Sequence, residues 1–381
     1  MLLSLGWPGA SADTGAPAVP ARCASVTWPK FHFDLRNSGH NPCERELGPT
    51  TVGDLTVRWA AQTGGYVESS PAVVDGVVYG ATGTVDGTGR TFEYALSADT
   101  GETIWRRQQY GAAVSDVTVA GGMVLVGTND DHKVRAFDAA TGTRVWSFIG
   151  GGAMNTPVVY KSRVYVGSAD GRLYALDAAS GHEVWSYQTG SLIEAAPAIS
   201  HGVVYVGSND ENLYAIDAAS GALVWSAPTR GEIVGSAAVA NGRVFVGSGD
   251  HSVYAFDAES GALDWATPTR SFVGSSPAVA WGMVYVGSLD RRVYAFDQTT
   301  GAIVWSRVTG DVIVGASPAV ANGVVYIGSE DRTIYAFDAL TGGRLWSFTT
   351  GDIIGDEAVL DGVLYVGSFD GNIYAFGLPA D

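Results

Sequence analysis

ALDAASGHEVW, residues 175–185, is one of six near-copies of a segment that ends in tryptophan. The shared pattern is Ala-x-Asp-x-x-[Thr/Ser]-Gly-x-x-x-Trp, and it also begins at Ala136, Ala215, Ala255, Ala295 and Ala336. Eight tryptophans recur with successive gaps of 46, 41, 39, 40, 40, 40 and 41 residues, at Trp59, Trp105, Trp146, Trp185, Trp225, Trp265, Trp305 and Trp346. A period of about forty residues is the mark of a repeat protein.

Each repeat contains four short strands and no helix. The motif follows a run such as VYVGSADGRLY (164–174), in which apolar and small residues flank a tight turn typical of a β-hairpin. A third strand precedes this hairpin, as PAIS (197–200) precedes HGVVYVG (201–207), with the turn between them at His201-Gly202. Four antiparallel strands per forty residues predict a β-propeller blade, and the length from Gly48 to the end accommodates eight blades.

The first and last repeats complement each other. Trp59 lies in DLTVRWAAQ (54–62) without a preceding Ala-x-Asp segment, whereas the last repeat ends at YAFG (374–377) before any tryptophan. We therefore predict an all-β, eight-bladed propeller in which the N-terminal strand completes the last blade and leaves no open edge. The expected organisation is a signal-peptide remnant and linker at 1–22, a lead-in segment at 23–53 and the propeller at 54–381.

The repeated motif resembles the tryptophan-docking motif of the eight-bladed quinoprotein alcohol dehydrogenases and their non-catalytic, BamB-type relatives. In the first full repeat it reads ALSADTGETIW (95–105), with Ser97 in place of Asp. The lead-in TWPKFHFDLRNSGHNP (27–42) also resembles the approach segment of that family. The resemblance implies a propeller whose eight tryptophans dock each blade on the next.

The catalytic members of this family use pyrroloquinoline quinone and Ca²⁺, held by adjacent cysteines, a stacking tryptophan and Glu, Asn and Asp ligands. This sequence has no Cys-Cys pair, and its three other tryptophans, Trp7, Trp28 and Trp281, are poorly placed to form the floor of a quinone site. The loops between the middle blades are short, and only the loop at 81–94 is longer than its counterparts. We therefore expect no cofactor, with pyrroloquinoline quinone and Ca²⁺ as the alternative.

The innermost strands are expected to line a central channel. Most channel positions are Gly, Ala or Ser, and six are acidic or amide residues: Glu68, Asp116, Asn155, Glu194, Asp356 and Glu357. They come from blades one to four and eight, so they are expected to gather on one side of the ring. Such a cluster suits a cation or a cationic ligand, or is simply solvated in a water-filled channel. No basic residue occurs in these segments to hold an anionic quinone.

Other polar residues are predicted to be structural. An aspartate recurs in the Gly-Ser-x-Asp turns, where it accepts local hydrogen bonds: Asp130, Asp170, Asp210, Asp250, Asp290, Asp331 and Asp370. The six histidines occupy different repeat positions and form no metal or catalytic set. No nucleophile elbow, His-Glu-x-x-His pair or phosphate loop is present, which leaves hydrolase, metalloprotease and nucleotide chemistry without a sequence motif.

The compartment is predicted from the N-terminal region. MLLSLGWPGASADTG has a short apolar run before Ala-Ser-Ala and resembles the tail of a secretory signal peptide, and no stretch is long enough to span a membrane. In an exported protein Cys23 and Cys43 are expected to form a disulfide, although the nearby His32 and His40 leave a zinc site as an alternative. The predicted location is secreted, periplasmic or extracellular.

The charge of the whole chain argues against nucleic-acid binding. It has 22 basic and 39 acidic residues, a formal net charge of −17. The leading hypothesis is a monomeric, non-catalytic propeller that binds a protein partner or a small ligand on an end face. The alternatives are an oxidoreductase using pyrroloquinoline quinone and Ca²⁺, and a carbohydrate- or small-molecule-binding propeller or lyase that uses Trp281 or the loop at 81–94.

Overall fold

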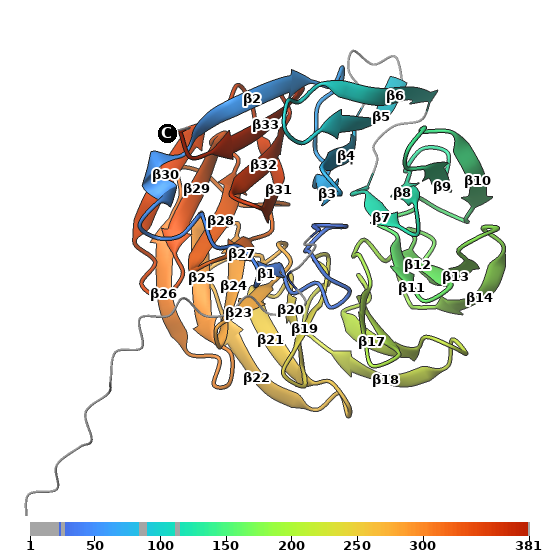
Figure 1. Cartoon of the computed structure of the whole chain (residues 1–381). Coiled ribbons are helices and arrows are strands. Elements are labelled where there is room, and N and C mark those ends of the chain that lie inside the picture. Colours follow the sequence, from blue (N-terminus) through green and yellow to red (C-terminus); the bar gives the residue numbers. More distant parts are fainter. Residues whose placement is uncertain (1–22, 24–26, 84–89, 111–114, 380–381) are drawn as a thin grey trace, which may run out of the picture.

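The computed structural model describes residues 23, 27–83, 90–110 and 115–379, and these form eight four-stranded antiparallel blades around a central channel (Figure 1). The predicted all-β, eight-bladed propeller is therefore confirmed. The signal-peptide remnant proposed at 1–22 lies outside the described residues, as does the middle of the loop at 81–94. No helix in the described part of the chain is long and apolar enough to cross a membrane.

The strands follow one another from the channel outward in each blade. Blades 1 and 2 consist of β3 (Ala72–Val74), β4 (Val77–Ala81), β5 (Arg90–Ser97), β6 (Thr103–Tyr110), β7 (Thr118–Ala120), β8 (Met123–Gly127), β9 (Lys133–Asp138) and β10 (Arg144–Ile149). Blades 3 and 4 consist of β11 (Val158–Tyr160), β12 (Arg163–Gly167), β13 (Arg172–Asp177), β14 (Glu183–Gln188), β15 (Ala198–Ser200), β16 (Val203–Gly207), β17 (Asn212–Asp217) and β18 (Leu223–Pro228).

The second half of the ring repeats this order. Blades 5 and 6 consist of β19 (Ala238–Ala240), β20 (Arg243–Gly247), β21 (Ser252–Asp257), β22 (Leu263–Pro268), β23 (Ala278–Ala280), β24 (Met283–Ser288), β25 (Arg292–Asp297) and β26 (Ile303–Val308). Blade 7 consists of β27 (Ala319–Ala321), β28 (Val324–Ser329), β29 (Thr333–Asp338) and β30 (Arg344–Thr349). Blade 8 contains β31 (Ile354–Leu360), β32 (Val363–Ser368) and β33 (Asn372–Gly377).

The N-terminal strand closes the ring. After the 3₁₀ turn η2 (Val52–Asp54), strand β2 (Thr56–Gln62) pairs antiparallel with β33 and becomes the outermost strand of blade 8. The predicted closure is confirmed: the ends of the propeller domain meet in one sheet, side by side in Figure 1. Closure satisfies the backbone of both terminal strands, which would otherwise present open edges.

Each tryptophan of the repeat docks on the following blade. The Trp225 indole donates from Nε1 to the Ala258 carbonyl of blade 5 at 3.2 Å, and Trp105 makes the same bond to Ala139 at 2.8 Å. A Cβ at Gly261, which has φ +72°, would lie 2.7 Å from the Trp225 ring. The motif glycine therefore provides a left-handed backbone and a flat seat for the indole of the preceding blade.

The apolar core is divided among the blade interfaces. One cluster joins Leu213 and Trp225 of blade 4 to Val244, Tyr254 and Phe256 of blade 5. Aliphatic and aromatic side chains form similar clusters at the other interfaces, so the core follows the ring instead of filling one centre.

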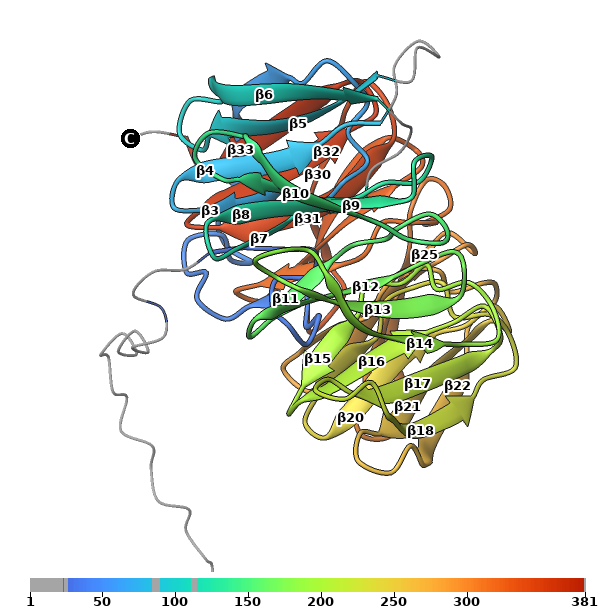
Figure 2. The same cartoon turned by 90° about the vertical axis from the view of Figure 1, so that its right-hand side faces the viewer.

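The lead-in segment crosses one end of the channel and joins the innermost strands of the blades. Trp28 and Val73 of blade 1 each donate a backbone hydrogen bond to the other. The Ile199 amide of blade 4 donates to the Leu35 carbonyl. Further along, β1 (His40–Asn41) adds to blade 7 as a parallel strand beside β27. In the side view this blue segment lies on one face of the ring (Figure 2). A disulfide joins Cys23, at the start of the segment, to Cys43, which follows β1.

Candidate functional site

A cavity of about 500 Å³ opens at the end of the channel opposite the lead-in segment. Turns between the blades and within them form its rim, and five of the six predicted channel residues line it: Glu68, Asp116, Asn155, Glu194 and Asp356. Val314, Ile353 and Phe369 of blades 7 and 8 line the other wall. The predicted polar residues therefore gather on the side of blades 1–4 and 8, and the wall of blades 7 and 8 combines these apolar side chains with Glu330.

Beneath this cavity one residue from each blade takes part in a belt of hydrogen bonds. All eight stand at the same repeat position, just before the innermost strand: Ser70, Asp116, Thr156, Ala196, Ser236, Ser276, Ser317 and Asp356. The Ala196, Ser236 and Ser276 amides each donate to the hydroxyl oxygen of the next member, at 2.8, 2.8 and 3.0 Å. The only break is between Thr156 and Ala196, because alanine has no side-chain acceptor. The belt was not predicted from the sequence, although its members recur about every forty residues.

The two belt aspartates accept hydrogen bonds from both neighbouring blades. Asp356 accepts from the Ser317 amide at 2.6 Å and from the Ser70 hydroxyl at 3.0 Å. Asp116 accepts from the Ser70 amide at 2.7 Å and from the Thr156 hydroxyl at 3.0 Å. Both oxygens of each carboxylate thus hold the ring together. These aspartates, predicted as ligands in the channel, have a structural role that does not require a ligand.

The carboxyl groups of the cavity are electrostatically coupled. Burial raises the pKa of Asp356 well above its usual range, and the nearby Asp116 and Glu68 add to the shift against the opposing hydrogen bonds. Burial and Asp116 likewise raise the pKa of Glu68. Burial also raises the pKa of Glu194, with a smaller contribution from Glu232. A positively charged group bound in the cavity would stabilise the ionised carboxylates and so lower these pKa values.

Glu357 does not line the cavity, contrary to the expectation for the channel. Neighbouring residues of a strand point to opposite sides, so Asp356 faces the cavity and Glu357 is directed between blades 7 and 8. Its side chain is buried, and a Cβ at Gly328 would lie 3.3 Å from its Oε1. Burial, with a contribution from Asp356, raises the pKa of Glu357 well above its usual range.

Lys30 of the lead-in segment supplies the basic group that the channel strands lack. It is buried and donates from Nζ to the carbonyl of Phe31 and to the side chain of Asn37. Burial lowers its pKa to about 8, and Asp116 and Asp34 oppose that shift. Asn37 in turn donates to the Ala237 carbonyl of blade 5 at 3.1 Å. Lys30 and Asp116 are far apart in the sequence and come close only in the folded ring, so no local sequence pattern could have indicated this contact.

The repeated turn aspartates accept hydrogen bonds from their own blades and, as at Asp210, from a glycine amide of the connection that precedes the blade. Tyr214 donates its hydroxyl to Asp210 Oδ2 at 2.7 Å, and the Asn212 amide donates to Asp210 Oδ1 at 3.0 Å. Tyr374 and Asp370 repeat the first contact at 2.7 Å. This geometry agrees with a role in the turn. Among the described residues, no group of three His, Cys, Asp or Glu side chains is arranged to hold a metal ion.

The cavity residues do not fit pyrroloquinoline quinone with Ca²⁺. Among the described lining residues there is no Lys, Arg, His, Cys or Trp, and Phe369 is the only aromatic. Trp28 is buried against Phe33 in the lead-in segment, and Trp281 is at the other end of the channel strands. An anionic quinone would meet Glu68, Glu194 and the two belt aspartates without a cation among these side chains.

The propeller repeats match a known family over most of the chain. The model described as outer membrane protein assembly factor BamB matches residues 55–157, 131–235, 209–312 and 293–378. The chain belongs to the BamB family. This confirms the family resemblance seen in the tryptophan-docking motif and agrees with the eight blades.

Catalytic quinoproteins are also among the similar proteins. The quinohemoprotein alcohol dehydrogenase ADH-IIG of Pseudomonas putida is 33% identical over 166 residues, which cover 39% of this chain and 22% of that protein. The BamB-family chain thus matches well under two thirds of the dehydrogenase's length.

Solved structures show the same fold. BamB from Moraxella catarrhalis superposes with a TM-score of 0.72 at 21% identity, over 86% of this chain and 98% of the other. The ADHIIG structure from Pseudomonas putida HK5 gives a TM-score of 0.80 at 16% identity, over 97% and 83%. At these identities the likeness shows the propeller fold, which both kinds of protein share.

Proposed function

We propose that this BamB-family chain is a non-catalytic binding platform of the cell envelope, and that a protein partner docks on the face bearing the acidic cavity. The belt is the observation that supports it: Asp116 and Asp356, the most deeply placed carboxyl groups of the cavity, are occupied in holding the blades together. A rigid ring with a charged, partly apolar mouth suits recognition of a partner surface.

The proposed partner presents a cationic side chain beside an apolar one. Glu68 and Glu194 are exposed at the cavity and are not members of the belt, whereas Val314 is an exposed apolar residue on the opposite wall. The name of the family, an outer membrane protein assembly factor, supports a partner from that machinery. The disulfide is consistent with an oxidising compartment such as the periplasm.

Oxidoreductase activity is the second candidate, favoured by the partial match to a quinohemoprotein alcohol dehydrogenase. A thermal-shift titration with pyrroloquinoline quinone and Ca²⁺, separately and together, distinguishes the two. A ligand at a hundred times its dissociation constant adds about 2.7 kcal/mol to folded stability. We expect no saturable joint shift, because the cavity lacks a cation and a stacking indole. A saturable joint shift would favour the oxidoreductase.

A crosslinking experiment tests the docking face directly. A photo-crosslinking amino acid placed at Glu194, on the cavity rim, should capture a component of outer membrane protein assembly in intact cells. The matched control is Glu183, an exposed glutamate on outer strand β14 of the neighbouring blade 3. Capture of the same component from Glu183 alone would contradict the assignment of the face.

A further inference from the structure

Two departures from the repeat meet at one place on the lead-in face. The turn after the innermost strand carries Trp281 in blade 6, where the other blades have a polar residue or glycine: Asp75, Gly121, Lys161, His201, Asn241, Asn322 and Asp361. The residue after the motif aspartate is Gln298 in the same blade, where six of the other seven blades have alanine and blade 8, which lacks the aspartate, has Leu378. In a chain of near-copies, two exceptions beside each other need an explanation of their own.

The turn itself does not favour tryptophan. Trp281 has φ +48°, a left-handed conformation that suits Gly, Asn and Asp and disfavours a bulky side chain. Its side chain is 45% exposed, so burial does not explain it either. His40 of the lead-in segment approaches the indole edge to face, with ring centroids 4.9 Å apart. The indole is therefore positioned while a large part of it stays accessible.

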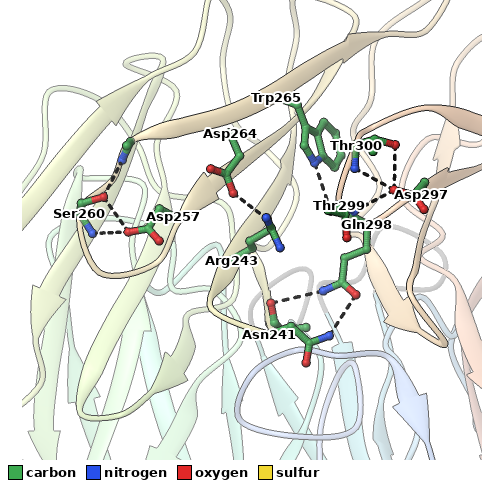
Figure 3. Close-up of polar contacts among 12 residues, drawn as sticks. Asn241, Arg243, Asp257, Ser260, Asp264, Trp265, Asp297, Gln298, Thr299 and Thr300 are labelled. Carbon is green, nitrogen blue, oxygen red and sulfur yellow. Dashed lines mark hydrogen bonds and ion pairs between the residues drawn. The ribbon is translucent and has the colours of Figure 1, made fainter.

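Trp281 and Gln298 line one cavity of about 480 Å³, a size typical of small-ligand sites. Gln298 is 4% exposed, accepts from Asn241 Nδ2 at 3.0 Å and donates to the Ala240 carbonyl at 3.4 Å. Figure 3 shows this pair of amides bridging blades 5 and 6. No described residue donates to Asn241 Oδ1, which leaves a fixed acceptor at the cavity. The amides are oriented before any ligand arrives.

The charges around the cavity are balanced. Arg36 donates from Nε and Nη2 to Asp34 Oδ2 at 3.2 and 3.0 Å, and both residues line the cavity. The ion pair offers donors and acceptors without a net charge, so the cavity has no strong preference for an anion or a cation. An apolar ligand would remove water from the remaining donors and acceptors of the amides and the ion pair without replacing its hydrogen bonds.

We propose that the cavity formed by Arg36, His40, Asn241, Trp281 and Gln298 binds a neutral saccharide. The exposed indole face accepts the C–H face of a sugar ring, and the amides and the ion pair match its hydroxyl groups, which both donate and accept. The site is at the opposite end of the channel strands from the acidic cavity. It does not depend on the proposed docking of a protein partner.

The test is a titration of the full chain with maltotriose, cellotriose and triacetylchitotriose, followed by saturation-transfer difference NMR. Trp281→Asn introduces the residue that Asn241 and Asn322 provide at the same turn, and Gln298→Ala introduces the residue that six of the other blades have. Both variants are therefore compatible with the fold, which their melting temperatures will check. His201→Asn changes the same turn in blade 4 and is the matched control.

We expect saturable binding of at least one trisaccharide in the millimolar range. Trp281→Asn should weaken it at least about tenfold through loss of the stacking surface, and Gln298→Ala should weaken it several-fold, while His201→Asn leaves it unchanged. Absence of saturable binding by all three sugars would overturn the proposal. So would a Trp281→Asn variant that binds as tightly as the original chain.

Discussion

At the residue scale, the motif glycine and the tryptophan of the preceding blade form one structural unit. Gly261 has φ +72°, and a Cβ there would meet the Trp225 ring at 2.7 Å. Gly242, in a hairpin turn of the same blade, has φ +76° with nothing within 4 Å of a Cβ. The two positions have nearly the same φ and differ in the space around a Cβ. A comparison of the two therefore distinguishes the need for a left-handed backbone from the need for room beside the indole.

We predict that Gly242→Ala destabilises the protein by about 1–2 kcal/mol, the cost of a side chain in the left-handed region. Gly261→Ala should cost about 1–3 kcal/mol more, because the methyl group displaces the indole. Chemical denaturation of both variants measures the difference. Equal losses of stability would show that the tryptophan is not held against the glycine.

The residues that could be predicted from the sequence make their contacts within or between neighbouring repeats, and those that could not be predicted depend on strand register or on contacts distant in sequence. The docking tryptophans and the turn aspartates act within the repeat, so spacing alone indicates where they lie. Lys30 approaches Asp116 from the lead-in segment, and Glu357 is directed away from the channel by the alternation of its strand. Such positions depend on register and on contacts distant in sequence, which a periodic pattern does not contain.

At the scale of the structural element, two devices hold the inner strands together. The lead-in segment joins them at one end of the channel, and the belt of side chains joins them beneath the acidic cavity. The sequence predicted the four strands of each blade and the pairing of β2 with the last blade. It did not predict the parallel pairing of β1 with β27, since such a contact joins residues far apart in the chain.

The belt predicts a stability effect for Ser276→Ala. Ser276 is 4% exposed, and its Oγ accepts the Ser236 amide at 2.8 Å. Alanine would leave that amide without its acceptor, at a cost of about 1–3 kcal/mol. The free energy of unfolding from chemical denaturation measures this cost.

Ser260→Ala is the control for the belt variant. Ser260 is exposed and caps a turn on the outer side of blade 5, so its loss should have a smaller effect than Ser276→Ala. If Ser276→Ala is no more destabilising than the control, the belt contributes little to joining the blades.

At the scale of the whole molecule, buried titratable groups set how stability depends on pH. Burial raises the pKa of Glu93 to about 8, with Arg135 opposing the shift. Burial likewise raises the pKa of Asp356 and Glu357 well above their usual range. The folded protein keeps protons on these groups that the unfolded chain releases. Their contribution to stability is therefore fully present at low pH and is lost as the pH rises through the folded-state pKa values.

Two other buried groups act outside the neutral range. Burial and the neighbouring Lys30 lower the pKa of His32 to about 3, so this ring costs stability only as the pH falls below its ordinary value of 6.5. Burial lowers the pKa of Lys30 from 10.5 to about 8. This group therefore lowers the free energy of unfolding as the pH falls from 10.5 towards about 8, where the unfolded chain binds the proton before the folded protein does. Between about pH 6.5 and 7.5 the raised carboxyl groups therefore dominate the slope.

We predict that the free energy of unfolding decreases from about pH 6.5 to about pH 7.5. Glu93 alone contributes a loss of about 1.4 kcal/mol over that unit, because one proton separates the folded from the unfolded state. Denaturant titrations at the two pH values measure the change. Glu93→Gln should reduce the decrease in the free energy of unfolding by about 1.4 kcal/mol over this pH unit. A free energy that is constant or increases over this interval would mean that Glu93 is ionised in the folded ring, which would require a closer pairing with Arg135 than the described geometry provides.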